Sequence, residues 1–290
     1  MHGLSLAIEL SMSSDQSSDT SLLHFLNCEA LDLNLFRGQS RDFKTGQVYG
    51  GQVLGQAIKA AYQTTDGTRG IHSAHAYFLL RGDVDAPIIY EVDRSLDGGS
   101  FSSRRVVAIQ HGRQIFHLSA SFQKHEEGLE YSEKWQPPFE LLQQALDKGI
   151  TEETNFQSEY LDVWYVPHEQ ATRRDSTQYW FKTKEALPDD LATHHTVLAY
   201  ISDMGPLEAT VEPHSLNAPK LEDRHKKVML ATIDHAIWFH RPFRADDWLF
   251  YECRAQSTGN GRGLAYGRIY TKDGTLVAST SQEGLLRIRR

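Results

Sequence analysis

The segment TIDHAIWFHRPF, residues 232–243, brings hydroxyl, carboxyl and imidazole side chains into one short run. Its β-branched and aromatic residues predict a strand that its proline ends. Alternation would place Thr232, Asp234 and His240 on one face of this strand and His235 on the other. Since both faces also carry large apolar residues, we expect the strand to be covered on both sides. Groups that exchange protons in such a place are candidates for acid–base chemistry.

Other chemistries lack their signatures in this sequence. There is no G-x-S-x-G nucleophile elbow, since GGSFS at 98–102 ends in the wrong residue and GLSLA at 3–7 lies in a predicted tail. Cys28 and Cys253 form no CxxC pair, so neither a disulfide framework nor a zinc ribbon is indicated. Fourteen histidines are present without an HExxH motif, and we predict neither a metal nor a cofactor. The glycine-rich GNGRG at 259–263 precedes a strand, which favours a loop over a phosphate cradle.

The composition is that of a globular protein of 290 residues, a length that favours two similar-sized units over one core. The net charge of -8 argues against a general nucleic-acid binder. No apolar run approaches the about 20 residues of a membrane span, so no membrane insertion is expected. The N-terminus lacks a basic region and carries Glu9 within its apolar part, unlike a signal peptide, and the chain ends in Ile-Arg-Arg rather than S-K-L. We therefore expect a cytoplasmic protein.

Two helices, each followed by several strands, organise the chain. We expect residues 1–21 to be disordered, a short helix after residue 22, and a longer helix over 47–64 that Gly50 and Gly51 open. A second long helix is predicted at 191–204 and a short one at 139–148. Strands are predicted at 71–81, 86–96, 100–111, 113–124, 160–166, 176–184, 232–243, 248–257, 263–271 and 275–288.

The second half of the chain repeats the first. HAYFLLR at 75–81 matches HAIWFHR at 235–241, LSASFQ at 118–123 matches VASTSQ at 277–282, and VLGQAI at 53–58 matches VLAYIS at 197–202. A repeat this long indicates a duplicated domain, here an α+β unit of one helix wrapped by an antiparallel sheet. We place the units at 22–125 and 156–290 with a linker at 126–155, and expect their sheets to join edge to edge.

Long motifs in this order resemble the double-hotdog acyl-CoA thioesterase II family over residues 22–290. They are LFRGQS (35–40), YGGQVLGQA (49–57), SFSSRRV (100–106), ATIDHAIWFHRPF (231–243) and VASTSQEG (277–284). The resemblance implies a tandem hotdog fold, an acyl-CoA substrate, and hydrolysis of its thioester to a fatty acid and coenzyme A.

The resemblance also implies a catalytic set. The family's Asp, Thr or Ser, and Gln fall on Asp203 in ISDM, Thr232 in ATIDH and Gln282 in TSQEG. Asp203 would activate a water, and the other two would orient it by accepting its hydrogens. Without the resemblance, Asp203 would be interpreted as a solvated residue at a helix end, where a carboxylate opposes the helix dipole.

Further site residues follow as hypotheses. The backbone N–H groups of Gly50 and Gly51 could stabilise an oxyanion, although close packing also explains glycine there. Coenzyme A is anionic, so Arg104, Arg105 and Arg262 are candidate contacts, with solvated surface arginines as the alternative. His235 could join the substrate site or be a hydrogen-bonded core histidine.

In an ungapped comparison of the two halves, only the second half carries the complete catalytic set. The three pairs are Asp203 with Lys59, Thr232 with His72, and Gln282 with Gln123. We therefore expect one productive site per chain, and a homo-oligomer because hotdog sheets commonly associate. Two other functions remain open: a hotdog enoyl-CoA hydratase, and a non-catalytic acyl-CoA-binding module.

Overall fold

The first half of the chain forms two helices and six strands. The computed structural model describes residues 21–43, 45–149, 159–173, 175–214 and 226–289. Along the first half run α1 (Leu22–Leu26), β1 (Glu29–Asp32), β2 (Leu35–Gly38), α2 (Gly50–Tyr62), β3 (Arg69–Phe78), β4 (Ile88–Asp97), β5 (Phe101–Gln110) and β6 (Arg113–Lys124). The disorder expected for residues 1–21 concerns positions that, apart from Ser21, lie outside the described residues.

The linker and the second half follow the predicted order and add two short elements. They comprise α3 (Phe139–Asp147), β7 (Leu161–Tyr165), β8 (Ser176–Thr183), α4 (Leu191–Ser202), α5 (Pro206–Ala209), β9 (Val228–Thr232), β10 (Asp234–Phe239), β11 (Leu249–Gly259), β12 (Arg262–Thr271) and β13 (Leu276–Ile288). Neither α5 nor β9 is among the elements predicted from the sequence. The end of the predicted linker, residues 150–155, lies outside the described residues.

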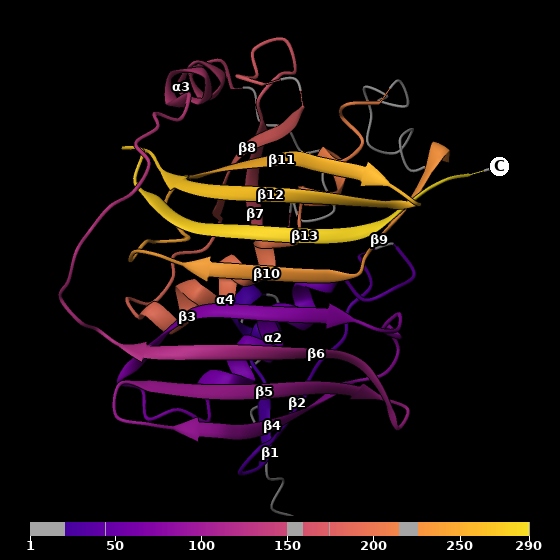
Figure 1. Ribbon diagram of the computed structural model, residues 1–290, viewed down its shortest axis with the longest axis vertical. Helices are drawn as coiled ribbons and strands as arrows, with labels where there is room; N and C mark the ends of the chain where they lie inside the picture. The colour runs from indigo at the N-terminus through magenta and orange to yellow at the C-terminus, as the bar shows by residue number, and fades with distance from the viewer. Residues whose placement is uncertain (1–20, 44, 150–158, 174, 215–225, 290) are drawn as a thin grey trace, which may run out of the picture.

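The strands form one antiparallel sheet in which the two halves meet at its centre. The strand order is β1-β2-β4-β5-β6-β3-β10-β13-β12-β11-β8-β7, and β9 also pairs with β13. The junction is the pair β3–β10, where Ala236 stands opposite His75. Figure 1 shows the first half below this junction and the second half above it. The expected edge-to-edge union is confirmed, and it pairs two strand edges that each half alone would expose.

The helices α2 and α4 pack against each other on one face of this sheet, the helix face (Figure 1). Every residue of α4 from His194 to Ser202 is buried, and α2 is buried over most of its length because its apolar residues recur at helical spacing. Small residues allow the close approach. A Cβ atom on Gly51 would collide with the Tyr200 carbonyl oxygen, and one on Gly55 would lie 3.3 Å from the Thr196 carbonyl oxygen.

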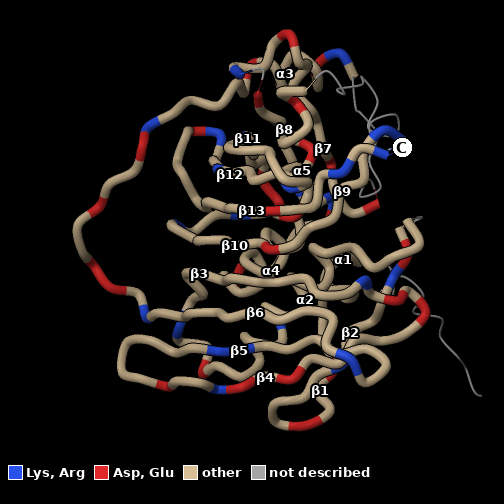
Figure 2. The backbone as a smooth tube through the Cα atoms, turned by 45° about the vertical axis from the view of Figure 1, so that its right-hand side comes forward, with Lys and Arg blue, Asp and Glu red and all other residues tan. Residues whose placement is uncertain are grey.

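The linker covers part of the other face of the sheet, its outer face. It arches away from the sheet after β6 and returns as α3 (Figure 2). Leu142 of α3 is fully buried in a second hydrophobic cluster with Trp180, Phe250 and Tyr270. The outer face of the second half is therefore partly buried, and α3 is fixed against that half.

The prediction of one strand over residues 232–243, covered on both faces, is wrong in two respects. Thr232 ends β9 and Asp234 begins β10, so two strands replace one. Only the helix face is consistently covered: His235, Ile237 and Phe239 are buried, while His240 is exposed. The sheet has helices α2 and α4 on one side here, and alternation therefore separates a buried face from a more accessible one.

The residue-by-residue match between the halves is also wrong, although each half has a long helix followed by several strands. His75 is exposed whereas His235 is buried, so the matching letters lie on opposite faces. Gln123 alternates with the buried Phe122 and lies on the outer face, whereas Gln282 is fully buried. Because a shift of one residue reverses a strand's faces, neither the offset of 160 between His75 and His235 nor that of 159 between Gln123 and Gln282 pairs residues of the same face.

The two remaining pairs do not correspond in position either. His72 contacts Ser121 on the outer face, with 2.8 Å between Nε2 and Oγ, and so does not occupy the place of Thr232. The residue that caps the C-terminus of α2 is Gln63, and the cap of α4 is Asp203. Gln63, rather than Lys59, is thus the positional counterpart of Asp203.

The contact between α2 and α4 yields a stability prediction. Gly51→Ala should lower the free energy of unfolding by about 1–3 kcal/mol, because the added methyl group overpacks against the α4 backbone. Urea denaturation measures this. Gly128→Ala is the control, since a Cβ atom there meets nothing within 4 Å. Equal stability of the two variants would show that the helices do not approach so closely.

Candidate active site

Asp203, Thr232 and Gln282 converge in space although 79 residues separate the first from the last. Thr232 Oγ1 donates to Asp203 Oδ1 at 3.2 Å, and Gln282 Nε2 donates to the same oxygen at 3.0 Å. Gln282 Nε2 also donates to Thr232 Oγ1 at 2.9 Å. The three side chains therefore form a closed triangle of hydrogen bonds around one carboxylate oxygen.

Each member of this triangle is positioned by the end or the inner face of an element. Asp203 caps the C-terminus of α4, and the chain turns away at Gly205, whose φ of +99° is a conformation that favours glycine. Thr232 ends β9 opposite Gly284 of β13. Gln282 lies on the helix face of β13 and is fully buried. The site therefore forms where α4 ends above the sheet.

The first half of the chain completes the site through the N-terminus of α2. The backbone N–H of Gly51 donates to the Asp203 carboxylate. A Cβ atom on Gly50 would lie 2.6 Å from Asp203 Oδ2. The N–H of Gly51 thus has the Asp203 carboxylate as a partner, and its role as an oxyanion donor stays a prediction. The N–H of Gly50 begins the helix and has no intrahelical acceptor, so it remains a candidate.

The surroundings of Asp203 raise its proton affinity. The pKa of this carboxyl is raised to about 7, chiefly by burial and to a smaller extent by the nearby carboxylate of Glu208. Hydrogen bonds from Thr232, Gln282 and Gly51 oppose the rise. Asp203 nevertheless keeps part of its surface accessible. A carboxyl group with a pKa near neutrality and access to solvent is suited to act as a general base.

His235 lies behind Gln282 and does not reach the accessible part of the site. It is 1% exposed, and its Nδ1 lies 2.7 Å from Gln282 Oε1. The predicted contact between His235 and substrate is therefore contradicted, and the alternative of a hydrogen-bonded core histidine is supported. The same bond occupies the Gln282 amide oxygen. Gln282 thus presents N–H donors to the site, and the prediction that its amide accepts a hydrogen from water is wrong.

The three candidate arginines differ in exposure. Arg104 is 2% exposed, and its guanidinium group donates to Thr64 Oγ1 at 2.8 Å and to Asp97 Oδ1 at 2.6 Å, so it braces the first half internally. This placement contradicts a role in binding coenzyme A. Arg105 and Arg262 are exposed on the outer face, and Arg262 donates to Glu283 Oε1 at 2.9 Å. These two remain available to an anion.

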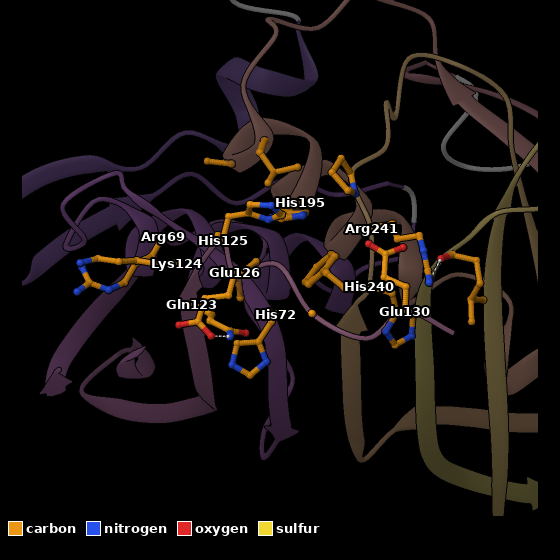
Figure 3. Close-up of a pocket in the computed structure, with 18 of the residues that line it drawn as sticks. Arg69, His72, Gln123, Lys124, His125, Glu126, Glu130, His195, His240 and Arg241 are labelled. Atoms are coloured by element: carbon orange, nitrogen blue, oxygen red, sulfur yellow. Dashed lines mark hydrogen bonds between the residues drawn. The ribbon is translucent and has the colours of Figure 1, made fainter. Parts of the chain in front are cut away.

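A cavity of about 1070 Å³ lies at the opposite end of the helix pair. It is lined by the C-terminus of α2, the N-terminus of α4 and the arching linker, and Figure 3 shows His72, His125, His195 and His240 around it. Since α2 has 13 residues, this cavity lies about 20 Å from the α2 N-terminus. The Tyr62 hydroxyl at its wall contacts His195 Nδ1 at 2.7 Å. The hydrogen-bonded triangle therefore lies elsewhere.

Comparisons with known proteins agree with this fold. Residues 39–123 match the family model of the acyl-CoA thioesterase N-terminal domain, and residues 135–286 match that of the C-terminal domain. The chain is 37% identical to acyl-CoA thioesterase 2 of Haemophilus influenzae, over 92% of this chain and 97% of that protein.

Solved structures give the fold class and then the family. A protein with the hot dog fold from Alicyclobacillus acidocaldarius has a TM-score of 0.70 at 17% identity, covering 94% of this chain and 98% of its own, and so this chain has the hotdog fold. Acyl-CoA thioesterase II TesB2 from Mycobacterium marinum has a TM-score of 0.75 at 36% identity, covering 91% of this chain and 96% of its own. The chain belongs to the acyl-CoA thioesterase family, and the protein is a thioester hydrolase. None of the described helices is long and apolar enough to cross a membrane.

The pKa of Asp203 can be tested without substrate. Infrared difference spectra should show a protonated carboxyl band that disappears with a pKa of about 7 and is absent from Asp203→Asn. Glu208→Gln removes a like charge, so the transition should move to lower pH. An unchanged transition in Glu208→Gln would contradict the electrostatic assignment, and a transition at the ordinary pKa of an aspartate would contradict the effect of burial.

Proposed function

We propose that this protein hydrolyses fatty acyl-CoA to a free fatty acid and coenzyme A, with Asp203 as the general base that activates water. The observation that carries this proposal is the triangle around Asp203 Oδ1. It holds a carboxylate of raised pKa in one orientation while part of its surface stays accessible. The family membership supports hydrolysis over hydration or simple binding of the same thioester.

The free acceptor capacity of Asp203 indicates where the water binds. Oδ1 already accepts hydrogen bonds from Thr232 and Gln282, which fills its two lone-pair positions. Oδ2 faces Gly50, where a side chain would occupy the space. We place the water at Oδ2 and the thioester carbonyl oxygen at the N–H of Gly50. The absence of a side chain at this position would then provide room for both.

The reaction follows from this placement. Asp203 takes a proton from the water as the water oxygen bonds to the carbonyl carbon, and the carbonyl π electrons move to oxygen. The N–H of Gly50 and the N-terminal dipole of α2 stabilise that oxyanion. Collapse of the tetrahedral intermediate breaks the carbon–sulfur bond, and the proton held by Asp203 neutralises the leaving thiolate. Thr232 and Gln282 keep the carboxylate aligned throughout.

The architecture is consistent with a tandem of two hotdog units at 22–125 and 156–290 that share one site. The second unit supplies the hydrogen-bonded triangle, and the first supplies the N-terminus of α2. This division supports the prediction of one productive site per chain. Among the predicted contacts for coenzyme A, Arg105 and Arg262 remain in the proposal because their side chains are exposed. A cytoplasmic location and a homo-oligomeric state remain predictions.

Removal of the base gives the direct test. Asp203→Asn should lower kcat about 10² to 10⁴-fold, because the water loses its proton acceptor. Release of free thiol from a series of acyl-CoA substrates measures this and defines the preferred chain length. Hydrolysis yields free thiol, whereas hydration or binding of the thioester does not.

A matched control shows whether a fall in kcat comes from loss of the base or from loss of any half-buried carboxylate. Asp234 accepts a hydrogen bond from the Glu283 N–H at 2.9 Å, and Asp234→Asn retains that acceptor. This variant should keep kcat near the wild-type value. Near-normal turnover by a folded Asp203→Asn enzyme would refute the role of Asp203 as the base.

A further inference from the structure

His235 connects the proposed site to the interior of the second half. Its two ring nitrogens both have partners: Nδ1 lies 2.7 Å from Gln282 Oε1, and Nε2 lies 2.9 Å from Ser202 Oγ. Ser202 immediately precedes Asp203 in the chain. Side chains of Asp203, Gln282, His235 and Ser202 therefore form a ring of contacts that leaves α4, crosses β13 and β10, and returns to α4.

Hydrogen-bond chemistry fixes the direction of the contacts that Gln282 makes with Asp203 and His235. A carboxylate only accepts, so the NH₂ group of Gln282 must face Asp203 and its oxygen must face His235. An amide oxygen also only accepts, so His235 Nδ1 carries a proton. Burial lowers the pKa of His235 to about 4, which keeps the imidazole neutral and leaves Nε2 as an acceptor. Ser202 Oγ lies 2.9 Å from both Nε2 and the Ala199 carbonyl oxygen, so its single hydrogen serves one of these two acceptors at a time.

Reversal of the Gln282 amide would be doubly unfavourable. Its oxygen would then face the Asp203 carboxylate, and its NH₂ group would face the N–H of His235. Both Gln282 and His235 are buried, so solvent cannot compensate for either conflict. The imidazole thus selects the only amide orientation that offers N–H groups to both Asp203 and Thr232.

We propose that His235 is a positioning residue of the thioesterase site, which acts as a neutral hydrogen-bond donor that locks Gln282 against Asp203 and Thr232. This inference rests on the proposed function of Asp203. It assigns His235 neither a contact with substrate nor a proton transfer. Its loss should therefore reduce kcat and leave KM unchanged, because the acyl-CoA contacts remain while the carboxylate loses its alignment.

The test compares His235→Leu with the wild-type enzyme. We expect kcat to fall about 10²-fold, as for a misaligned catalytic group. The acidic limb of the pH–rate profile should move to higher pH, because the hydrogen bond from Gln282 lowers the pKa of Asp203 and would be weakened. His235→Leu combined with Gln282→Leu should be no slower than Gln282→Leu alone.

Two conservative variants decide the question independently of how well the leucine variant folds. The Asn side chain places its NH₂ group near the Nδ1 position, and the Gln side chain places its own near Nε2. His235→Asn should recover most of kcat, and His235→Gln should not. Equal activity of these two variants, or additive losses in the double variant, would overturn the proposal.

A second buried histidine controls for general loss of packing. His194 is 3% exposed, and its Nδ1 accepts from the Ala245 N–H at 3.1 Å. His194→Leu should lower stability while kcat and the pH–rate profile stay unchanged. The Asp203→Asn variant distinguishes failure of the proposed function from failure of the role of His235. An active Asp203→Asn enzyme refutes the proposed function. An inactive Asp203→Asn enzyme together with a fully active His235→Leu enzyme refutes only the role of His235.

Discussion

The site depends on a contact between opposite ends of two antiparallel helices. Asp203 ends α4, where a carboxylate is disfavoured by about 0.3–1 kcal/mol through the helix dipole. The N-terminus of α2 lies against it, and the Gly51 N–H donates to its carboxylate. The favourable end of one helix thus compensates for the unfavourable end of the other. Since the helices come from different halves of the chain, neither half would make this site alone.

The two ends of the α2–α4 pair carry different residues. At one end of the helix pair, Asp203 meets Gly50 and Gly51. At the other, Gln63 caps α2, Asp190 caps α4, and the linker arches over a cavity with several imidazoles. Both halves have a long helix followed by several strands, yet the residues at the two ends of the helix pair differ in their chemistry. One half therefore provides the reactive group, and the other provides the helix terminus that faces it.

Secondary-structure elements and the residue types of the site could be predicted from the sequence. The face of a strand on which a residue lies, and its hydrogen-bond partners, were predicted less well. Helical spacing identified α2 and α4, and turn residues separated most strands, because these signals are local. The resemblance identified Asp203, Thr232 and Gln282, which the fold brings into contact. The pairing of residues between the halves failed, since identical residues at matched positions, such as His75 and His235, lie on opposite faces of their strands.

Partners within the site could not be derived from the sequence. Nothing in the sequence shows that Gln282 would direct its amide oxygen at His235, or that the Gly51 N–H would bind a carboxylate. Arg104 was a reasonable candidate for an anion until its burial was known. Such properties depend on contacts between residues far apart in the chain, and only the folded structure defines them.

The central claim is that Asp203 activates water and does not itself attack the thioester. A single turnover in isotopically labelled water, followed by mass analysis of both the fatty acid and the peptide that contains Asp203, tests this most directly. The account predicts label in the free acid and none in the peptide. Label in the Asp203 carboxylate would reveal an acyl-enzyme anhydride and would contradict the account.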